Sequence, residues 1–233
     1  MKRESRSVLV TGASSGLGAF LARAFAHAGY AVVLHGRDEA RLRALHGEIL
    51  KKEKADCPMV AGDLGTPAGV RAVQAALGAH GVGVLVNNAA VNPELASGVS
   101  ATEIEDVRAV LDVNTAAPIA LSYAARAHFK AAGGGTIVNV NTVAGLRGSS
   151  REVMYAVSKF GLRGFSESVK EDWLKEGIKI IDVFSGALGT GMSAHRADRE
   201  QLIAPQELAE FLVGLCATKS FFVKELNVRR TAV

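Results

Sequence analysis

The stretch TGASSGLG, which occupies Thr11–Gly18, joins two segments of opposite character. Before it, the run SVLVT at Ser7–Thr11 is mostly apolar and β-branched, as in a buried strand. After it, residues 16–30 carry apolar side chains at helical spacing. Glycines between a strand and a helix let the chain turn sharply and let a pyrophosphate approach the free N–H groups of the first helical turn. The stretch, of the form TGxxxGxG, therefore predicts a phosphate-binding βα unit.

The rest of the chain repeats this alternation of short apolar runs and longer helical patterns. The expected strands are Ser7–Thr11, Ala31–His35, Cys57–Asp63, Gly83–Ala90, Gly135–Asn141, Ile178–Phe184 and Ser220–Val228. The expected helices are 16–30, Asp38–Lys54, Thr66–Ala79, Thr102–Ala132, Arg151–Glu176 and Ala204–Ala217. Such alternation predicts an α/β fold: one doubly wound, Rossmann-type domain over residues 1–233, with a parallel sheet of about seven strands and helices on both faces.

Composition excludes several classes of protein. The net charge of +4 comes from 27 basic and 23 acidic residues that are scattered, so no nucleic-acid partner is expected. Cys57 and Cys216 form no CxxC or Cys/His cluster, so we expect no metal site. No apolar run has transmembrane length, and the first residues have no long apolar core of a secretory signal. We therefore expect a cytoplasmic protein with reduced thiols and no membrane partner.

The end of the second expected strand bears on cofactor choice. NAD-binding proteins of this type usually place an acidic residue there, on the ribose hydroxyls. Here Gly36 is followed by Arg37. Glycine leaves room for a 2′-phosphate, and arginine offers it a bidentate cation. Asp38 is expected to cap the next helix instead. The sequence therefore favours NADP(H) over NAD(H).

Tyr155 and Lys159 are four residues apart on an expected helix, so both project from one face. A free tyrosine has a pKa near ~10, and a nearby ammonium group favours the phenolate and should lower that pKa. The pair then becomes a usable general acid/base. Thr142 lies 13 residues before Tyr155 and offers a hydroxyl that can orient a substrate oxygen. Together these three side chains predict proton transfer to or from an oxygen.

Taken in chain order, these motifs resemble the short-chain dehydrogenase/reductase family over nearly the whole chain. The matching pieces are Thr11–Gly18, Asp63-Leu64, NNAA at Asn87–Ala90, Asn114, Thr142, Tyr155 with Lys159, and SGALGT at Ser185–Thr190. The sequence departs from the family pattern at Ala90, where glycine is usual, at Ser185, where proline is usual, and at Thr142, where serine is usual.

The resemblance implies roles for these residues. The expected cofactor-binding residues, with Arg37 added from its charge, are Gly12, Ser14, Ser15, Gly16, Leu17, Gly18, Arg37, Asp63, Leu64, Asn88, Ala89, Ala90, Tyr155, Lys159 and Thr190. The expected catalytic residues are Asn114, Thr142, Tyr155 and Lys159. In the family, Asp63 would bind the adenine amino group, Thr190 the nicotinamide carboxamide, and Asn114 a water leading to the lysine.

We therefore expect an NADP-dependent oxidoreductase that interconverts a carbonyl and an alcohol on a small molecule. One alternative is a 3-oxoacyl-carrier-protein reductase, although such reductases usually end near a DGG turn and this chain ends KELNVRRTAV. Another is a catalytically weak NADP-binding regulatory protein, which the presence of Tyr155 and Lys159 disfavours. A short substrate lid is expected near 191–204. The two long helices are expected to pair across a two-fold axis, as in the family, and to form a homodimer or homotetramer.

Overall fold

A single sheet organises the molecule. The computed structural model describes residues 7–94, 103–193 and 196–231. Its strands are β1 (Ser7–Val10), β2 (Ala31–Gly36), β3 (Met59–Ala61), β4 (Val82–Asn87), β5 (Gly135–Thr142), β6 (Ile178–Ser185) and β7 (Glu225–Val228). All neighbouring pairs are parallel, in the order β3-β2-β1-β4-β5-β6-β7. The predicted seven-stranded, Rossmann-type α/β fold is confirmed.

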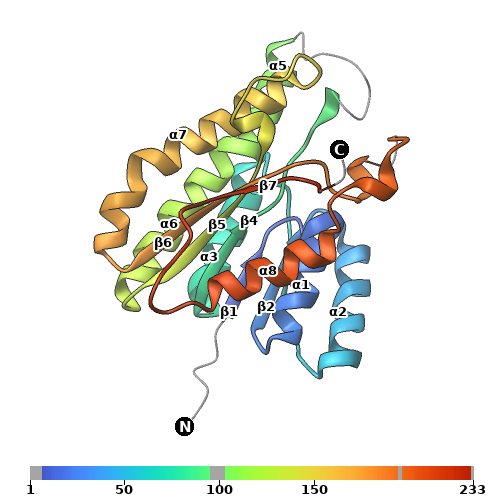
Figure 1. Ribbon diagram of the computed structural model, residues 1–233. Helices are drawn as coiled ribbons and strands as arrows, with labels where there is room; N and C mark the ends of the chain where they lie inside the picture. The colour runs from blue at the N-terminus through green and yellow to red at the C-terminus, as the bar shows by residue number, and fades with distance from the viewer. Residues whose placement is uncertain (1–6, 95–102, 194–195, 232–233) are drawn as a thin grey trace.

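Helices cover both faces of this sheet (Figure 1). They are α1 (Gly16–His27), α2 (Glu39–Glu53), α3 (Pro67–Ala79), α5 (Ile104–Leu111), α6 (Ala117–Ala131), α7 (Val153–Lys175) and α8 (Pro205–Cys216). Apolar residues of α1, α2 and α8 pack on one face, and those of α3, α6 and α7 on the other. None of the described helices is both long and apolar enough to cross a membrane.

The central strands supply both apolar cores because their side chains alternate between the two faces. Val8 and Val10 belong to the core under α1 and α8, whereas Leu9 between them belongs to the core under α3 and α6. β2 follows the same rule, with Val33 facing opposite to its neighbours. Burial on both sides explains why these strands read as continuous apolar runs.

The long helix expected at Thr102–Ala132 is interrupted. Its first residue lies outside the described residues, and α5 and α6 are separated by a π-helical turn at Asp112–Ala116. A π turn contains one residue more than an α turn and is frequent at functional sites. Asn114 stands in this turn and is fully buried.

Helix starts follow the sequence chemistry. Asp38 caps α2 as expected, and its Oδ1 accepts from the N–H of Arg41 at 3.0 Å. Thr66 caps α3 in the same way through Gly69. In contrast, Glu152 at the start of α7 makes no side-chain cap bond to that helix.

Candidate active site

One large cleft, of about 1940 Å³, opens where several parallel strands end. It is lined by residues that directly follow β1, β2, β4, β5 and β6, as expected for the ligand crevice of an open α/β sheet. The residues assigned from the sequence that line it are Gly12, Ser14, Ser15, Gly16, Leu17, Arg37, Asp63, Leu64, Asn88, Ala89, Ala90, Thr142, Tyr155, Lys159 and Thr190. The fold thus brings together motifs that lie far apart in the chain.

The glycine loop is shaped by close backbone approaches. Gly12 has φ +67°, and a Cβ there would lie 2.9 Å from the Cα of Ala89. At Gly18, which does not line the cleft, a Cβ would lie 2.2 Å from the carbonyl oxygen of Gly12. Gly16 has φ +54° and faces Thr190 across the loop. Such a loop, ending in the first turn of α1, presents bare backbone to a ligand, and these residues fit a dinucleotide pyrophosphate.

The turn after β4 holds this loop in place. The Thr11 hydroxyl oxygen accepts from the backbone N–H groups of Asn88 and Ala89, at 2.9 and 3.0 Å, and the hydroxyl donates to the carbonyl of Val86 at 3.0 Å. The Asn88 side-chain amide donates to the Thr11 carbonyl at 2.8 Å. Asn88 therefore lines the cleft and also fixes the glycine loop.

At the far end of the glycine loop, Arg37 and Asp63 lie beside each other. The Nη1 atom of Arg37 is 3.8 Å from an Asp63 carboxylate oxygen, and both side chains are substantially exposed to the cleft. A Cβ added at Gly36 would lie 2.9 Å from the Ser14 hydroxyl oxygen. Ser14 therefore packs directly against Gly36, and the arginines Arg37 and Arg41 both line the cleft.

His35, a residue that belongs to none of the sequence motifs, lies beneath this loop. Its Nε2 is 3.2 Å from the Gly62 carbonyl, and its Nδ1 is buried with no hydrogen-bond partner among the described residues. Burial lowers the pKa of His35 to about 4, although the Gly62 bond and the charge of Asp63 oppose this. The ring is therefore neutral at pH 7. Its position inside a strand gave no signal in the sequence.

The three side chains of the expected reaction centre line the same cleft. Thr142 ends β5, and its hydroxyl oxygen accepts from the Ala144 N–H at 3.4 Å, which leaves the hydroxyl proton free to donate. Tyr155 lies in the first turn of α7, and Lys159 follows one turn later. The Lys159 ammonium lies 5.6 Å from the centre of the Tyr155 ring and donates to the Val140 carbonyl at 2.8 Å.

The prediction that Lys159 lowers the pKa of Tyr155 is wrong. Burial raises the pKa of Tyr155 above its usual range, and the negative charge of Glu152 adds to this. Burial also lowers the pKa of Lys159, to about 8. Desolvation disfavours both charged forms, and here it outweighs the attraction that the spacing suggested. At neutral pH the phenol is therefore protonated, and the ammonium group keeps most of its charge.

Asn114 lies behind the wall of the cleft and does not line it. Its Oδ1 accepts from the Val91 N–H, and its Nδ2 donates to the Val91 carbonyl, both at 2.8 Å. The same Nδ2 is 3.1 Å from the Ser158 hydroxyl on α7. The π turn thus ties the segment after β4 to α7.

The described residues of the segment proposed as a lid include two short turns. Gly191–Ser193 and Arg199–Gln201 are single 3-10 turns, and Leu188 forms a β-bridge with Ile203. Asp198 accepts hydrogen bonds from Arg196 at 2.8 Å and from Arg230 at 2.6 Å. Arg230, near the end of the chain, therefore holds this segment through its contact with Asp198.

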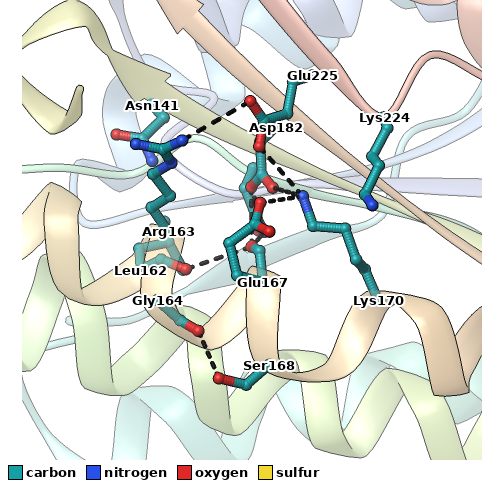
Figure 2. Close-up of polar contacts among 12 residues, drawn as sticks. Asn141, Leu162, Arg163, Gly164, Glu167, Ser168, Lys170, Asp182, Lys224 and Glu225 are labelled. Carbon is teal, nitrogen blue, oxygen red and sulfur yellow. Dashed lines mark hydrogen bonds and ion pairs between the residues drawn. The ribbon is translucent and has the colours of Figure 1, made fainter.

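A second charged cluster lies away from the cleft, between α7, β6 and β7 (Figure 2). Ligand atoms of Glu167, Asp182 and Glu225 lie within 4.8 Å of one another, a spacing that suits a cation. The cation is the buried ammonium of Lys170, which lies 2.5, 3.5 and 3.3 Å from these carboxylates in turn. Arg163 approaches Glu225 at 4.0 Å. The cluster is therefore compensated by the chain's own cations.

A glycine loop at a helix N-terminus and a Tyr-Lys pair in the same crevice define an oxidoreductase that uses a nicotinamide dinucleotide. A model of the short chain dehydrogenase family matches residues 6–201. The chain belongs to this family and is an NAD(P)-dependent oxidoreductase.

Three known proteins illustrate the likeness. An uncharacterized oxidoreductase of Thermotoga maritima is 33% identical over 187 residues, which cover 80% of this chain and 73% of that protein. The structure of a metagenomic short-chain oxidoreductase in complex with NADP superposes with a TM-score of 0.84 at 30% identity, covering 97% and 98% of the two chains. A short-chain dehydrogenase from Sphingobium yanoikuyae, in complex with NADPH, gives 0.83 at 27% identity, covering 96% and 87%.

Proposed function

We propose that this protein is an NADP(H)-dependent reductase of small carbonyl compounds, with Tyr155 as the proton donor. The observation that carries this proposal is the pairing of Tyr155, which is half-buried and protonated at neutral pH, with Lys159 in a cleft that the cationic Arg37 also lines. When bound, the nicotinamide ring supplies the hydride, or accepts it in the reverse direction. The similarity to NADP-bound and NADPH-bound relatives supports the same cofactor.

The protein's own groups would act on the carbonyl oxygen. The Thr142 hydroxyl donates a hydrogen bond to this oxygen and orients it. As the carbonyl carbon gains a hydride, the developing alkoxide takes the phenolic proton of Tyr155. The Lys159 ammonium stabilises the resulting phenolate, and it also holds the ribose hydroxyls by analogy with the family. At neutral pH the phenol is protonated, so it carries the proton that the reduction step needs.

A screen of NADPH oxidation against ketones, aldehydes and keto acids tests this function directly. We expect turnover with at least one group of carbonyl compounds and a preference for NADPH over NADH. Turnover only with 3-oxoacyl thioesters would favour the acyl-carrier-protein reductase. Tight NADPH binding without turnover on any carbonyl would favour a regulatory protein.

We also propose that residues 1–233 form one domain and that residues 191–204 form a substrate lid. We further propose that the protein is located in the cytoplasm.

Arg37→Asp is expected to weaken NADPH binding at least about tenfold. The substitution replaces an attractive contact to the 2′-phosphate, worth roughly 1.5–3 kcal/mol, with a repulsive one next to Asp63. NADH binding should be unchanged or improved, because a carboxylate can accept from the 2′-hydroxyl. Dissociation constants for both nucleotides, measured by fluorescence titration, check this.

Arg43→Asp is the matched control, since Arg43 pairs with Glu39 on the outer face of α2 and does not line the cleft. If the Arg37 variant and this control bind NADPH equally well, Arg37 is only a surface residue.

Sedimentation at micromolar concentration should show a dimer or tetramer. Ile104, Val153, Val157 and Phe160 on α5 and α7 are exposed apolar side chains, and so is Tyr123 on α6. A monomer rarely leaves this much apolar surface on neighbouring helices exposed. A purely monomeric sample would contradict the proposed assembly.

A further inference from the structure

The carboxylate of Glu94 forms the N-terminal cap of α7 from a distant part of the chain. Both of its oxygens accept from the backbone N–H of Met154, at 3.2 and 3.1 Å, and one also accepts from the N–H of Tyr155 at 3.2 Å. The first N–H groups of a helix have no partner within the helix, so such a cap satisfies donors that are otherwise unpaired.

The helix does not provide this cap itself. Glu152 stands at the N-cap position but makes no side-chain cap bond, because its carboxylate accepts from the Asn92 side chain at 3.0 Å. Glu94 therefore takes over the capping role that a local residue performs at α2 and α3.

Glu94 is buried, so its carboxylate depends on these hydrogen bonds for compensation. Glu94 is only 7% exposed, and the hydrogen bonds of its carboxylate come from backbone N–H groups of Met154 and Tyr155. A buried, unpaired carboxylate is costly unless hydrogen-bond donors compensate it. The positive end of the α7 dipole and the two N–H groups provide that compensation.

The same short segment is anchored on its other side. Asn114 binds both backbone groups of Val91, and it also reaches Ser158 on α7. Residues 91–94 are thus held between the π turn and the start of α7, which carries the proton donor.

We propose that Glu94 is a positioning residue for Tyr155: by holding the Tyr155 backbone N–H, it sets where the phenol stands relative to Thr142 and Lys159. This inference rests on the proposed reductase function. A displacement of about 1 Å at a reacting group can cost about 100-fold in rate, so a cap on the Tyr155 backbone acts directly on turnover.

The test compares Glu94→Ala and Glu94→Gln with Glu176→Gln as a matched control. Glu176 follows the opposite end of α7, where it pairs with Arg126 and Lys130 away from the cleft. We expect Glu94→Ala to lower kcat at least about tenfold, with KM and the NADPH dissociation constant nearly unchanged. Glu94→Gln keeps one acceptor oxygen and should recover part of kcat. The control should keep wild-type kcat.

Hydrogen exchange provides a readout that does not depend on turnover. The amides of Met154 and Tyr155 should exchange faster in Glu94→Ala than in the wild type, and those of the control should not. Melting temperatures and NADPH titration establish that each variant is folded.

The outcomes separate the two proposals. Unchanged exchange at these two amides overturns the cap. Faster exchange with wild-type kcat, or a Gln variant no better than the Ala variant, overturns the positioning role alone. Absence of turnover in the wild type overturns the proposed function, and the positioning role with it.

Discussion

Replacement of Tyr155 by phenylalanine is expected to lower kcat by about 10²–10⁴-fold while NADPH binding is nearly unchanged. The substitution removes one oxygen and its proton and keeps the ring, so the packing at the start of α7 is preserved. Without the phenol hydroxyl, no acid is positioned to protonate the substrate oxygen as it gains negative charge during reduction. Steady-state kinetics, with fluorescence titration of NADPH, measures both quantities.

Tyr123→Phe is the control for this experiment. Tyr123 lies on α6, is half exposed, and packs against Phe165 and Trp173 away from the cleft. Retention of most activity in the Tyr155 variant would refute its assigned role.

Lys170→Met is expected to cost about 3–5 kcal/mol of the free energy of unfolding. The Lys170 side chain is almost fully buried, and Asp182 beside it is completely buried. Removing the ammonium leaves the Asp182 carboxylate without its counter-charge, although Ser166 and Asn139 still donate to it. Denaturant unfolding measures the loss.

Lys175→Met is the matched control on the same helix, since Lys175 is exposed and pairs only with Asp172. Its effect should stay within about 0.5 kcal/mol. The double variant with Asp182→Asn should regain part of the stability lost in Lys170→Met, because no buried charge is then left.

The loss should depend on pH in a defined direction. Burial is the main cause that raises the pKa of Asp182, and removal of Lys170 raises this pKa further. A carboxyl whose pKa is higher in the folded than in the unfolded state gains stability as the pH falls through the folded pKa towards the unfolded pKa. The deficit of Lys170→Met should therefore shrink as the pH falls from 7 through the raised pKa of Asp182, and a deficit that stays constant throughout this titration would contradict this account.

The sequence predicted the sheet and most of its helices because both depend on local patterns. Continuous apolar strands, capping residues and the glycine loop each act within a few residues. β7 is shorter than expected, at Glu225–Val228, because a composition-based boundary does not show where pairing with β6 begins.

Contacts between distant segments were not predictable in this way. Glu94 is 61 residues from Tyr155, and Lys170 is 55 residues from Glu225, so no spacing rule connects them. The pKa of Tyr155 was predicted in the wrong direction for a related reason. The four-residue spacing shows that Lys159 is near, whereas the burial that outweighs it depends on the whole fold.

The π turn at Asp112–Ala116 sets the rotation of one helical segment relative to the next. Since an α-helix has 3.6 residues per turn, one additional residue rotates everything after it by about 100° about the axis. α5 therefore faces α7, while α6 directs Leu121, Ala125 and Phe129 into the core beneath the sheet. A single helical periodicity of apolar residues therefore cannot describe both α5 and α6. Substitutions in α5 can change the wall of the cleft without changing which residues of α6 face the core.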